Sequence, residues 1–111
     1  MSNEQHRQGD VIMERIDTIP EGLANHPREG GRLILAHGEV TGHAHAITEQ
    51  QFANMWTNGK TDTVDEELFL KADVPLKVTH EEHGTIELGM GNWKITRQKE
   101  YSAEAIRRVA D

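Results

Sequence analysis

Short apolar runs separated by turn-forming residues constrain the fold of this chain more than any other feature. Val11–Met13 and Leu33–Ala36 are such runs, Leu76 and Val78 alternate with a lysine, and Pro20–Gly22 and Gly30–Gly31 lie in the polar intervals. Strands separated by turns at intervals of about eight to twelve residues are typical of all-β sandwiches and small barrels. The sequence has no long amphipathic helical pattern and no alternation of strands with helices. We therefore expect an all-β fold, a small β-sandwich or barrel.

The apolar pattern also predicts individual elements. We expect strands at residues 10–16, 32–36, 43–48, 66–72, 76–80, 85–88 and 92–97. Residues 49–56 fit either a short helix or a strand, and Asn58-Gly59 favours a hairpin with residues 66–72. Gly89-Met90-Gly91 predicts a second hairpin, between the strands at residues 85–88 and 92–97.

Length and composition bound the organisation of the chain. Its 111 residues are the length of one domain. We assign residues 9–111 to a single β domain and expect the polar residues 1–8 to form a disordered N-terminal tail. Ser102 is a suitable cap for a short C-terminal helix over residues 103–110. The apolar content of 35% is low, so we expect a metal ion or homo-oligomer formation to contribute to stability.

The charge balance excludes several classes of partner. The 19 acidic and 12 basic residues give a formal net charge of −7, which repels phosphate backbones and anionic membrane surfaces. No stretch approaches the length of a membrane span. The chain has no cysteine, which excludes disulfides and thiolate metal sites. We expect a cytoplasmic protein that binds neither nucleic acid nor membrane.

Two pairs of histidines are the strongest chemical signal in the sequence. The first pair is His43 and His45, which on a strand leave the same face roughly 6–7 Å apart at Cα. That spacing lets two imidazoles bind one ion at about 2.0–2.1 Å. Glu49 is a candidate for a further ligand. The alternative is a solvated pair, or a pair held in a hydrogen-bonded network.

The second pair is His80 and His83, within the sequence His-Glu-Glu-His. Residues three apart do not share a face of a regular strand, so both reach one ion only if the strand ends or bulges near Glu82. Gly84 favours such a break. Together the pairs predict a divalent-metal site with four ligands: His43, His45, His80 and His83. Four imidazoles close a tetrahedral site, whereas three with a carboxylate leave a position open.

The remaining polar residues near these pairs have two interpretations each. Glu81 and Glu82 are either solvated or act on a bound metal, by orienting an imidazole or as a general base. Arg97 and Tyr101 either bind a carboxylate ligand or, as we favour, pair with the acidic surface and anchor the terminal helix. The residue types alone identify no catalytic group.

The first histidine pair resembles a known motif. Gly38-x4-His43-Ala-His45-x3-Glu49 resembles the first metal motif of the cupins, in which a His-x-His pair and a following glutamate bind a divalent ion inside a double-stranded β-helix. The resemblance implies a cupin-like fold, with His43, His45 and Glu49 as ligands. The second cupin motif, Pro-x-Gly followed by a lone histidine, is not recognisable, and the His80–His83 segment would substitute for it.

The chain as a whole is similar to a group of small, uncharacterised bacterial proteins. They share four segments, which here are Gly9–Val11, Gly42–His45, His80–His83 and Arg97–Tyr101. This resemblance supports the boundaries of the predicted elements and implies no activity.

Two hypotheses for function follow from these residues. In the first, the protein binds one divalent transition metal (zinc, iron, manganese or nickel), which binds or acts on a small molecule. In the second, it is a non-catalytic, homo-oligomeric structural or interaction module with histidines at an interface. A third, weaker hypothesis is a pH-responsive element, because clustered histidines repel one another once protonated.

Overall fold

The computed structural model describes residues 4–37, 43–48, 53–61, 63 and 65–98. Strands account for all the regular structure of these residues, which contain no helix. The strands are β1 (Gln5–Gln8), β2 (Val11–Ile16), β3 (Ala24–Asn25), β4 (Leu33–His37), β5 (Ala44–Ile47), β6 (Ala53–Thr57), β7 (Leu68–Ala72), β8 (Leu76–Thr79), β9 (Ile86–Leu88) and β10 (Gly91–Arg97). The helix expected at residues 103–110 lies outside the described residues.

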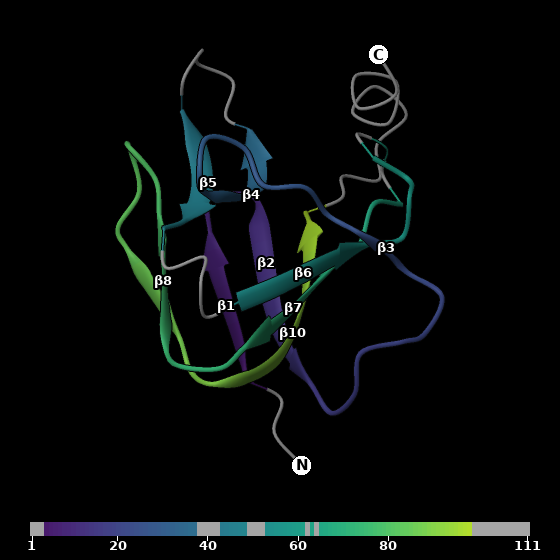
Figure 1. Cartoon of the computed structure of the whole chain (residues 1–111). Coiled ribbons are helices and arrows are strands. Elements are labelled where there is room, and N and C mark those ends of the chain that lie inside the picture. Colours follow the sequence, from purple (N-terminus) through teal and green to yellow (C-terminus); the bar gives the residue numbers. More distant parts are fainter. Residues whose placement is uncertain (1–3, 38–42, 49–52, 62, 64, 99–111) are drawn as a thin grey trace.

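The strands form two antiparallel sheets (Figure 1). The larger sheet has the order β1-β2-β10-β7-β6-β3, and the smaller has the order β4-β5-β8-β9. The expectation of an all-β sandwich is confirmed.

One apolar core joins the two sheets, because inward-facing apolar residues alternate with outward-facing ones along most strands. The larger sheet contributes Val11, Met13, Leu68, Leu70, Trp93 and Ile95 to this core. The smaller sheet contributes Leu33, Leu35, Ile47, Leu76, Val78 and Leu88. Fully burying each such aliphatic side chain stabilises the fold by about 1.5–3 kcal/mol. Leu76 and Val78 are fully buried while Lys77 between them is exposed, so β8 has the period of a strand with one inward face.

Strand β4 departs from this alternation. Its residues 33–36 are all buried, as the continuous apolar run predicted. Leu33 and Leu35 belong to the main core, whereas Ile34 forms a separate buried cluster with Ala44 and Ala46 of β5. The smaller sheet is therefore covered on both faces at β4 and β5.

The N-terminal segment corrects one expectation. Residues 5–8 of the expected disordered tail form β1, which pairs with β2 from Gln5 opposite Glu14 to Gln8 opposite Val11. Gln8 is buried, with 2% of its surface exposed. Its polarity suggested a tail, but hydrogen bonds described below satisfy its amide.

The prediction of a hairpin between residues 85–88 and 92–97 is wrong, although both strands exist. Strand β9 pairs with β8 in the smaller sheet, and β10 pairs with β2 and β7 in the larger one. Gly89 and Gly91 make room for the Arg15 guanidinium, whose nitrogens lie 2.8 and 2.5 Å from the positions that Cβ atoms would occupy. The guanidinium stacks 4.4 Å from the Trp93 ring. The two glycines thus leave space for Arg15 where the chain crosses from the smaller sheet to the larger one.

The expected hairpin between β6 and β7 is confirmed, but its turn is longer than Asn58-Gly59 alone. The last paired residues are Thr57 and Leu68, so residues 58–67 form the connection. Asn58 organises this connection, because its amide donates to the Asp65 carbonyl oxygen at 2.8 Å and its Oδ1 accepts from the Lys60 N–H.

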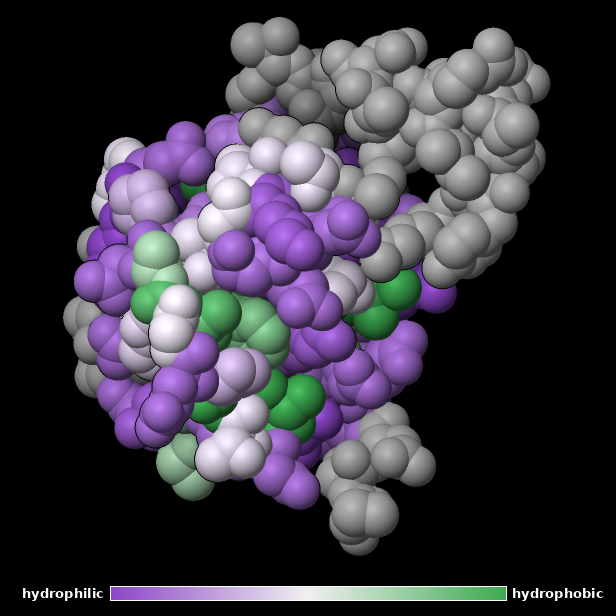
Figure 2. Space-filling view, turned by 90° about the vertical axis from the view of Figure 1, so that its right-hand side faces the viewer, coloured by the Kyte–Doolittle hydropathy of each residue, from purple (hydrophilic) through white to green (hydrophobic). Residues whose placement is uncertain are grey.

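The surface is mostly hydrophilic. In the face shown in Figure 2, hydrophobic residues form only small areas surrounded by hydrophilic ones. Among the described residues, Met90 is the exposed large hydrophobic side chain, with 63% exposure. The described part of the chain contains no helix long and apolar enough to cross a membrane.

Candidate functional site

The two histidine pairs meet at one end of the smaller sheet. Strands β5 and β8 are antiparallel neighbours, with Ala46 opposite Thr79, so the start of β5 lies beside the segment that follows β8 (Figure 1). Residues 43, 45, 80 and 83, which we call the histidine cluster, are thereby brought together. The ring centroids are 4.3 Å apart for His45 and His80, 4.7 Å for His80 and His83, 5.8 Å for His45 and His83, and 6.0 Å for His43 and His80.

The break required after β8 is present, since this strand ends at Thr79 and both second-pair histidines follow it. Exposure increases across the histidine cluster. His45 is buried at 4% exposure, His43 and His80 are half-buried, and His83 is exposed. The cluster therefore runs from the core of the sandwich to solvent.

A fixed hydrogen bond sets the tautomer of His45. The Gln8 Nε2 group donates to the carbonyl oxygens of Val78 at 2.9 Å and Gly84 at 2.8 Å. These two bonds turn Gln8 Oε1 toward His45 Nδ1, at 2.8 Å. Because an amide oxygen only accepts, Nδ1 carries the proton, and neutral His45 has its free lone pair on Nε2.

The surroundings keep His45 neutral. Burial first, and then the neighbouring His80 ring, lower the pKa of His45 to about 4. At neutral pH the Nε2 lone pair of His45 is therefore available to a Lewis acid or a hydrogen-bond donor.

The His80 ring is oriented differently. Its Nδ1 accepts a hydrogen bond from the Glu82 backbone N–H at 3.0 Å, so the neutral ring carries its proton on Nε2. Among the described residues, no group of three or more histidine, aspartate or glutamate side chains is arranged to hold a metal ion. The rings are close together, but their nitrogens are not positioned as a ready ligand set.

His43 contains an unsatisfied polar atom. Its Nδ1 is buried and has no hydrogen-bond partner within the described residues. Glu82 Oε2 lies 3.8 Å away, beyond hydrogen-bond distance. Buried polar atoms without a partner are uncommon and often mark a site for water or an ion.

The comparisons with known proteins place the chain in a family. Residues 7–98 match the model of a domain of unknown function, DUF8820. The chain belongs to this family. No curated protein and no solved structure matches it. The matched region contains every residue of the histidine cluster.

Both glutamates of the second histidine segment lie at the junction of the two pairs in this DUF8820 domain. Glu81 Oε1 accepts the Ala44 backbone N–H at 3.0 Å, and this hydrogen bond is the main reason that the pKa of Glu81 is lowered. Glu81 therefore ties the loop after β8 to the start of β5. Glu82 lies beside His43 and His80. Glu49, the further ligand suggested by the cupin motif, lies outside the described residues.

Three residues outside the predicted site adjoin the histidine cluster: Gln8, Gly9 and Asp10. Gly9 has φ of +60°, and a Cβ at this position would lie 2.8 Å from His83 Nε2. Asp10 Oδ1 lies 3.9 Å from His45 Nε2. The turn between β1 and β2 therefore adjoins the cluster in the DUF8820 fold. Of the three residues, only Gln8 belongs to the segment expected to be a disordered tail.

Arg97 pairs with an acidic residue, as we favoured, whereas the terminal helix that it was expected to anchor lies outside the described residues. Its Nε and one terminal nitrogen lie 2.9 and 2.7 Å from Asp10 Oδ2. The Gln98 backbone N–H donates to the Asp10 carbonyl oxygen at 2.7 Å. Tyr101 lies outside the described residues. Arg97 thus holds the Asp10 carboxylate in place.

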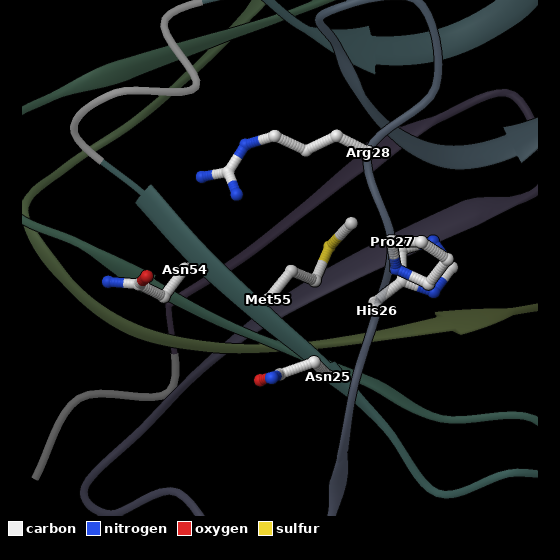
Figure 3. A pocket seen from close by; sticks show the side chains of 6 residues that line it. All are labelled: Asn25, His26, Pro27, Arg28, Asn54 and Met55. Atoms are coloured by element: carbon white, nitrogen blue, oxygen red, sulfur yellow. The ribbon is translucent and has the colours of Figure 1, made fainter.

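A separate surface cavity of about 300 Å³ lies on β3 and β6 of the DUF8820 domain and is lined by Asn25, His26, Pro27, Arg28, Asn54 and Met55. Figure 3 shows Arg28 extending across this cavity from the loop after β3, where it donates to the Ala53 carbonyl oxygen at 2.8 Å. His26 Nε2 lies 3.0 Å from the Ile34 carbonyl oxygen. The histidine here is committed to a backbone carbonyl, so the histidine cluster is the stronger candidate site.

Proposed function

We propose that the histidine cluster binds one divalent transition metal: zinc, iron, manganese or nickel. The observation that supports this most directly is the spacing of His45, His80 and His83. Imidazoles that bind one ion through nitrogens at about 2.0–2.1 Å have ring centroids roughly 5 Å apart at tetrahedral angles. The three centroid distances of 4.3, 4.7 and 5.8 Å lie around that value.

The hydrogen bonding of His45 also supports the proposal. Ligand histidines usually donate their second ring N–H to a fixed oxygen, which leaves the other nitrogen free for the metal. The Gln8 oxygen gives His45 this arrangement. The buried Nδ1 of His43 has no hydrogen-bond partner among the described residues, and a bound ion would provide one.

Metal binding requires His80 to turn, because its Nδ1 is bonded to the Glu82 N–H. Breaking one such bond costs about 0.5–1.5 kcal/mol. The apparent binding free energy of structural zinc sites is about 10–16 kcal/mol. The free-energy cost of this rotation is therefore small relative to the binding free energy of the ion. The His80 ring is half-buried, so solvent lies on one side of it.

The exposed side of the histidine cluster suggests what a bound ion does. With His83 at the surface, a set of three ligand histidines leaves a position for water or for a small molecule. An ion with an open position polarises a carbonyl or activates water. We propose a small-molecule ligand or substrate on this ground.

Location and assembly belong to the same proposal. A chain without cysteine suits a reducing cytoplasm, and the low apolar content favours a homo-oligomer. A non-catalytic module with histidines at an interface is the alternative. In that alternative, dissociation of the oligomer would change the environment of the histidines, whereas a chelator would not.

The test is elemental analysis of protein purified without a polyhistidine tag. We expect about one divalent transition metal per chain, lost in the His43→Ala/His45→Ala double variant and in His83→Ala. His37→Ala is the matched control for His83→Ala, since both rings are exposed, and it should keep the metal. Equal metal content in wild type and His83→Ala, or none in wild type after reconstitution, would contradict the proposal.

A further inference from the structure

The turn between β1 and β2 brings a carboxylate to the histidine cluster. Gln8 pairs with Val11 across this turn, and Gln8 is itself bonded to the carbonyls of Val78 and Gly84 on either side of the second histidine pair. Gly9 approaches His83 so closely that a Cβ would lie 2.8 Å from its Nε2. The pairing of β1 with β2 and the hydrogen bonds of Gln8 thus hold this turn against the histidine cluster.

The two carboxylate oxygens of Asp10 have different surroundings. Oδ2 accepts both hydrogen bonds from Arg97. Oδ1 makes no hydrogen bond within the described residues, and it lies 3.9 Å from His45 Nε2. Arg97 therefore fixes the carboxylate with its second oxygen beside the cluster.

His45 Nε2 and Asp10 Oδ1 are both hydrogen-bond acceptors in neutral His45, because Gln8 holds the proton on Nδ1. Two acceptors side by side repel one another unless a cation or a donor lies between them. Neighbouring ligand atoms of one ion, bound at about 2.0–2.2 Å, lie roughly 3 Å apart. A movement of less than about 1 Å brings the pair to that separation.

We propose that Asp10 supplies an oxygen ligand to the ion bound by the histidine cluster, an inference that rests on the proposed function. The ligand set is then mixed, with imidazole nitrogens from the two histidine pairs and one carboxylate oxygen from the β1–β2 turn. A ligand set that includes a carboxylate oxygen suits manganese and iron better than a set of imidazoles alone. Asp10 therefore shifts the preference of the site toward these harder ions. Arg97 acts as a positioning residue, since it touches the carboxylate rather than the ion.

The test compares Asp10→Asn with a control variant, Asp73→Asn, and with a positioning variant, Arg97→Gln, in the full chain, using Mn²⁺ and Zn²⁺ as probes. Asp73→Asn removes the same charge from an exposed position before β8, at the strand end opposite to His80. Arg97→Gln removes the ion pair but keeps the carboxylate. We expect Asp10→Asn to raise the Kd for Mn²⁺ on the order of 10–100-fold, and the Kd for Zn²⁺ by less. Asp73→Asn should keep the wild-type Kd for Mn²⁺ to within a small factor. Arg97→Gln loses the positioning contact but keeps the ligand oxygen, so it should raise this Kd by a smaller factor than Asp10→Asn does.

The outcomes separate this inference from the proposed function. If wild type binds Mn²⁺ or Zn²⁺ and Asp10→Asn binds both with unchanged Kd, Asp10 is not a ligand and the histidine site stands. Equal losses in Asp10→Asn and Arg97→Gln would assign the effect to the ion pair and overturn the inference. If wild type binds neither ion, both proposals fail.

A measurement on the wild-type chain keeps the inference testable should Asp10→Asn not fold. Zinc is diamagnetic, so the ¹³Cγ resonance of Asp10 can be followed by NMR as Zn²⁺ is added. A carboxylate that becomes a ligand shifts this resonance in step with ring resonances of the histidine cluster. A ¹³Cγ resonance that stays in place while the ring resonances move would overturn the inference.

Discussion

Gln8 Oε1 accepts the Nδ1–H hydrogen bond of His45 at 2.8 Å, and both side chains are buried. This contact connects the first strand of the larger sheet with the centre of the histidine cluster. It decides which ring nitrogen carries the proton. It therefore also decides which nitrogen can meet an ion.

Gln8→Ala should reduce both stability and metal affinity. The substitution leaves the His45 N–H and two backbone carbonyls without their partner, which costs on the order of 3 kcal/mol of unfolding free energy. Loss of an oxygen that orients a ligand histidine typically lowers metal affinity about 10–100-fold. Denaturant unfolding and a metal titration check the two effects. Gln5→Ala, an exposed position on the same strand, is the control, and equal effects at both positions would contradict the role of Gln8.

Gly9→Ala should weaken metal binding by contact with His83. Its φ of +60° makes an added Cβ strained by about 1–2 kcal/mol, and that Cβ would lie 2.8 Å from His83 Nε2. Gly30 offers a matched control, because its φ is +59° and nothing lies within 4 Å of an added Cβ. We expect similar losses of stability from Gly9→Ala and Gly30→Ala, with reduced Zn²⁺ affinity only in the first. Reduced affinity in both, or in neither, would count against the contact.

Metal-free protein should lose stability as the pH falls from about 6.5 to about 4. The pKa of His45 is lowered to about 4 in the folded state from an ordinary 6.5. Above this range both states are neutral at His45. Within it the unfolded chain takes up a proton that the folded chain does not, so unfolding becomes more favourable, by on the order of 3 kcal/mol at the lower end.

Urea unfolding at a series of pH values, with a chelator present, measures this slope. His45→Gln should remove much of the slope, whereas His37→Gln, at an exposed ring, should keep it. A wild-type stability that is constant across the range would contradict the lowered pKa of His45. This prediction also tests the hypothesis of a pH-responsive element, since the same loss would occur without any metal.

Added metal should stabilise the fold. An ion that binds only the folded state, at a free concentration of 100 times its Kd, contributes about 2.7 kcal/mol, which raises Tm on the order of 10 °C in a domain of this size. Differential scanning calorimetry with Zn²⁺ and then with excess chelator measures the change. The His43→Ala/His45→Ala double variant should show no rise. A rise of the same size in that variant would mean that the ion binds elsewhere.

The strands were largely predictable because each carries its own apolar pattern. The alternation in β2 and β8 and the continuous run in β4 are local signals of burial on one or two faces. The crossing between β9 and β10 was not predictable, since a glycine pair favours a hairpin when only the chain itself is considered. The Arg15 guanidinium that occupies this space comes from β2, far away in the sequence, and stacks on Trp93 of β10.

The candidate site was predictable in its histidines and not in their neighbours. His-x-His and His-Glu-Glu-His are visible as patterns, and antiparallel pairing of β5 with β8 brings them together. Gln8 and Asp10 lie far from both pairs in sequence. A polar segment at a chain terminus reads as a tail unless its hydrogen-bond partners are known, and those partners are backbone carbonyls that no sequence pattern reveals.

Long-range ¹H–¹⁵N NMR of the imidazole rings tests the central claim most directly, because it reports the state of each ring nitrogen separately. In metal-free protein we expect His45 to be protonated at Nδ1 and not at Nε2. Upon addition of one equivalent of Zn²⁺, nitrogens of His45, His80 and His83 should shift together to values of metal-bound imidazole, while His37 stays unchanged. Cluster resonances that keep their metal-free positions at one equivalent of Zn²⁺ would contradict a metal site at these histidines.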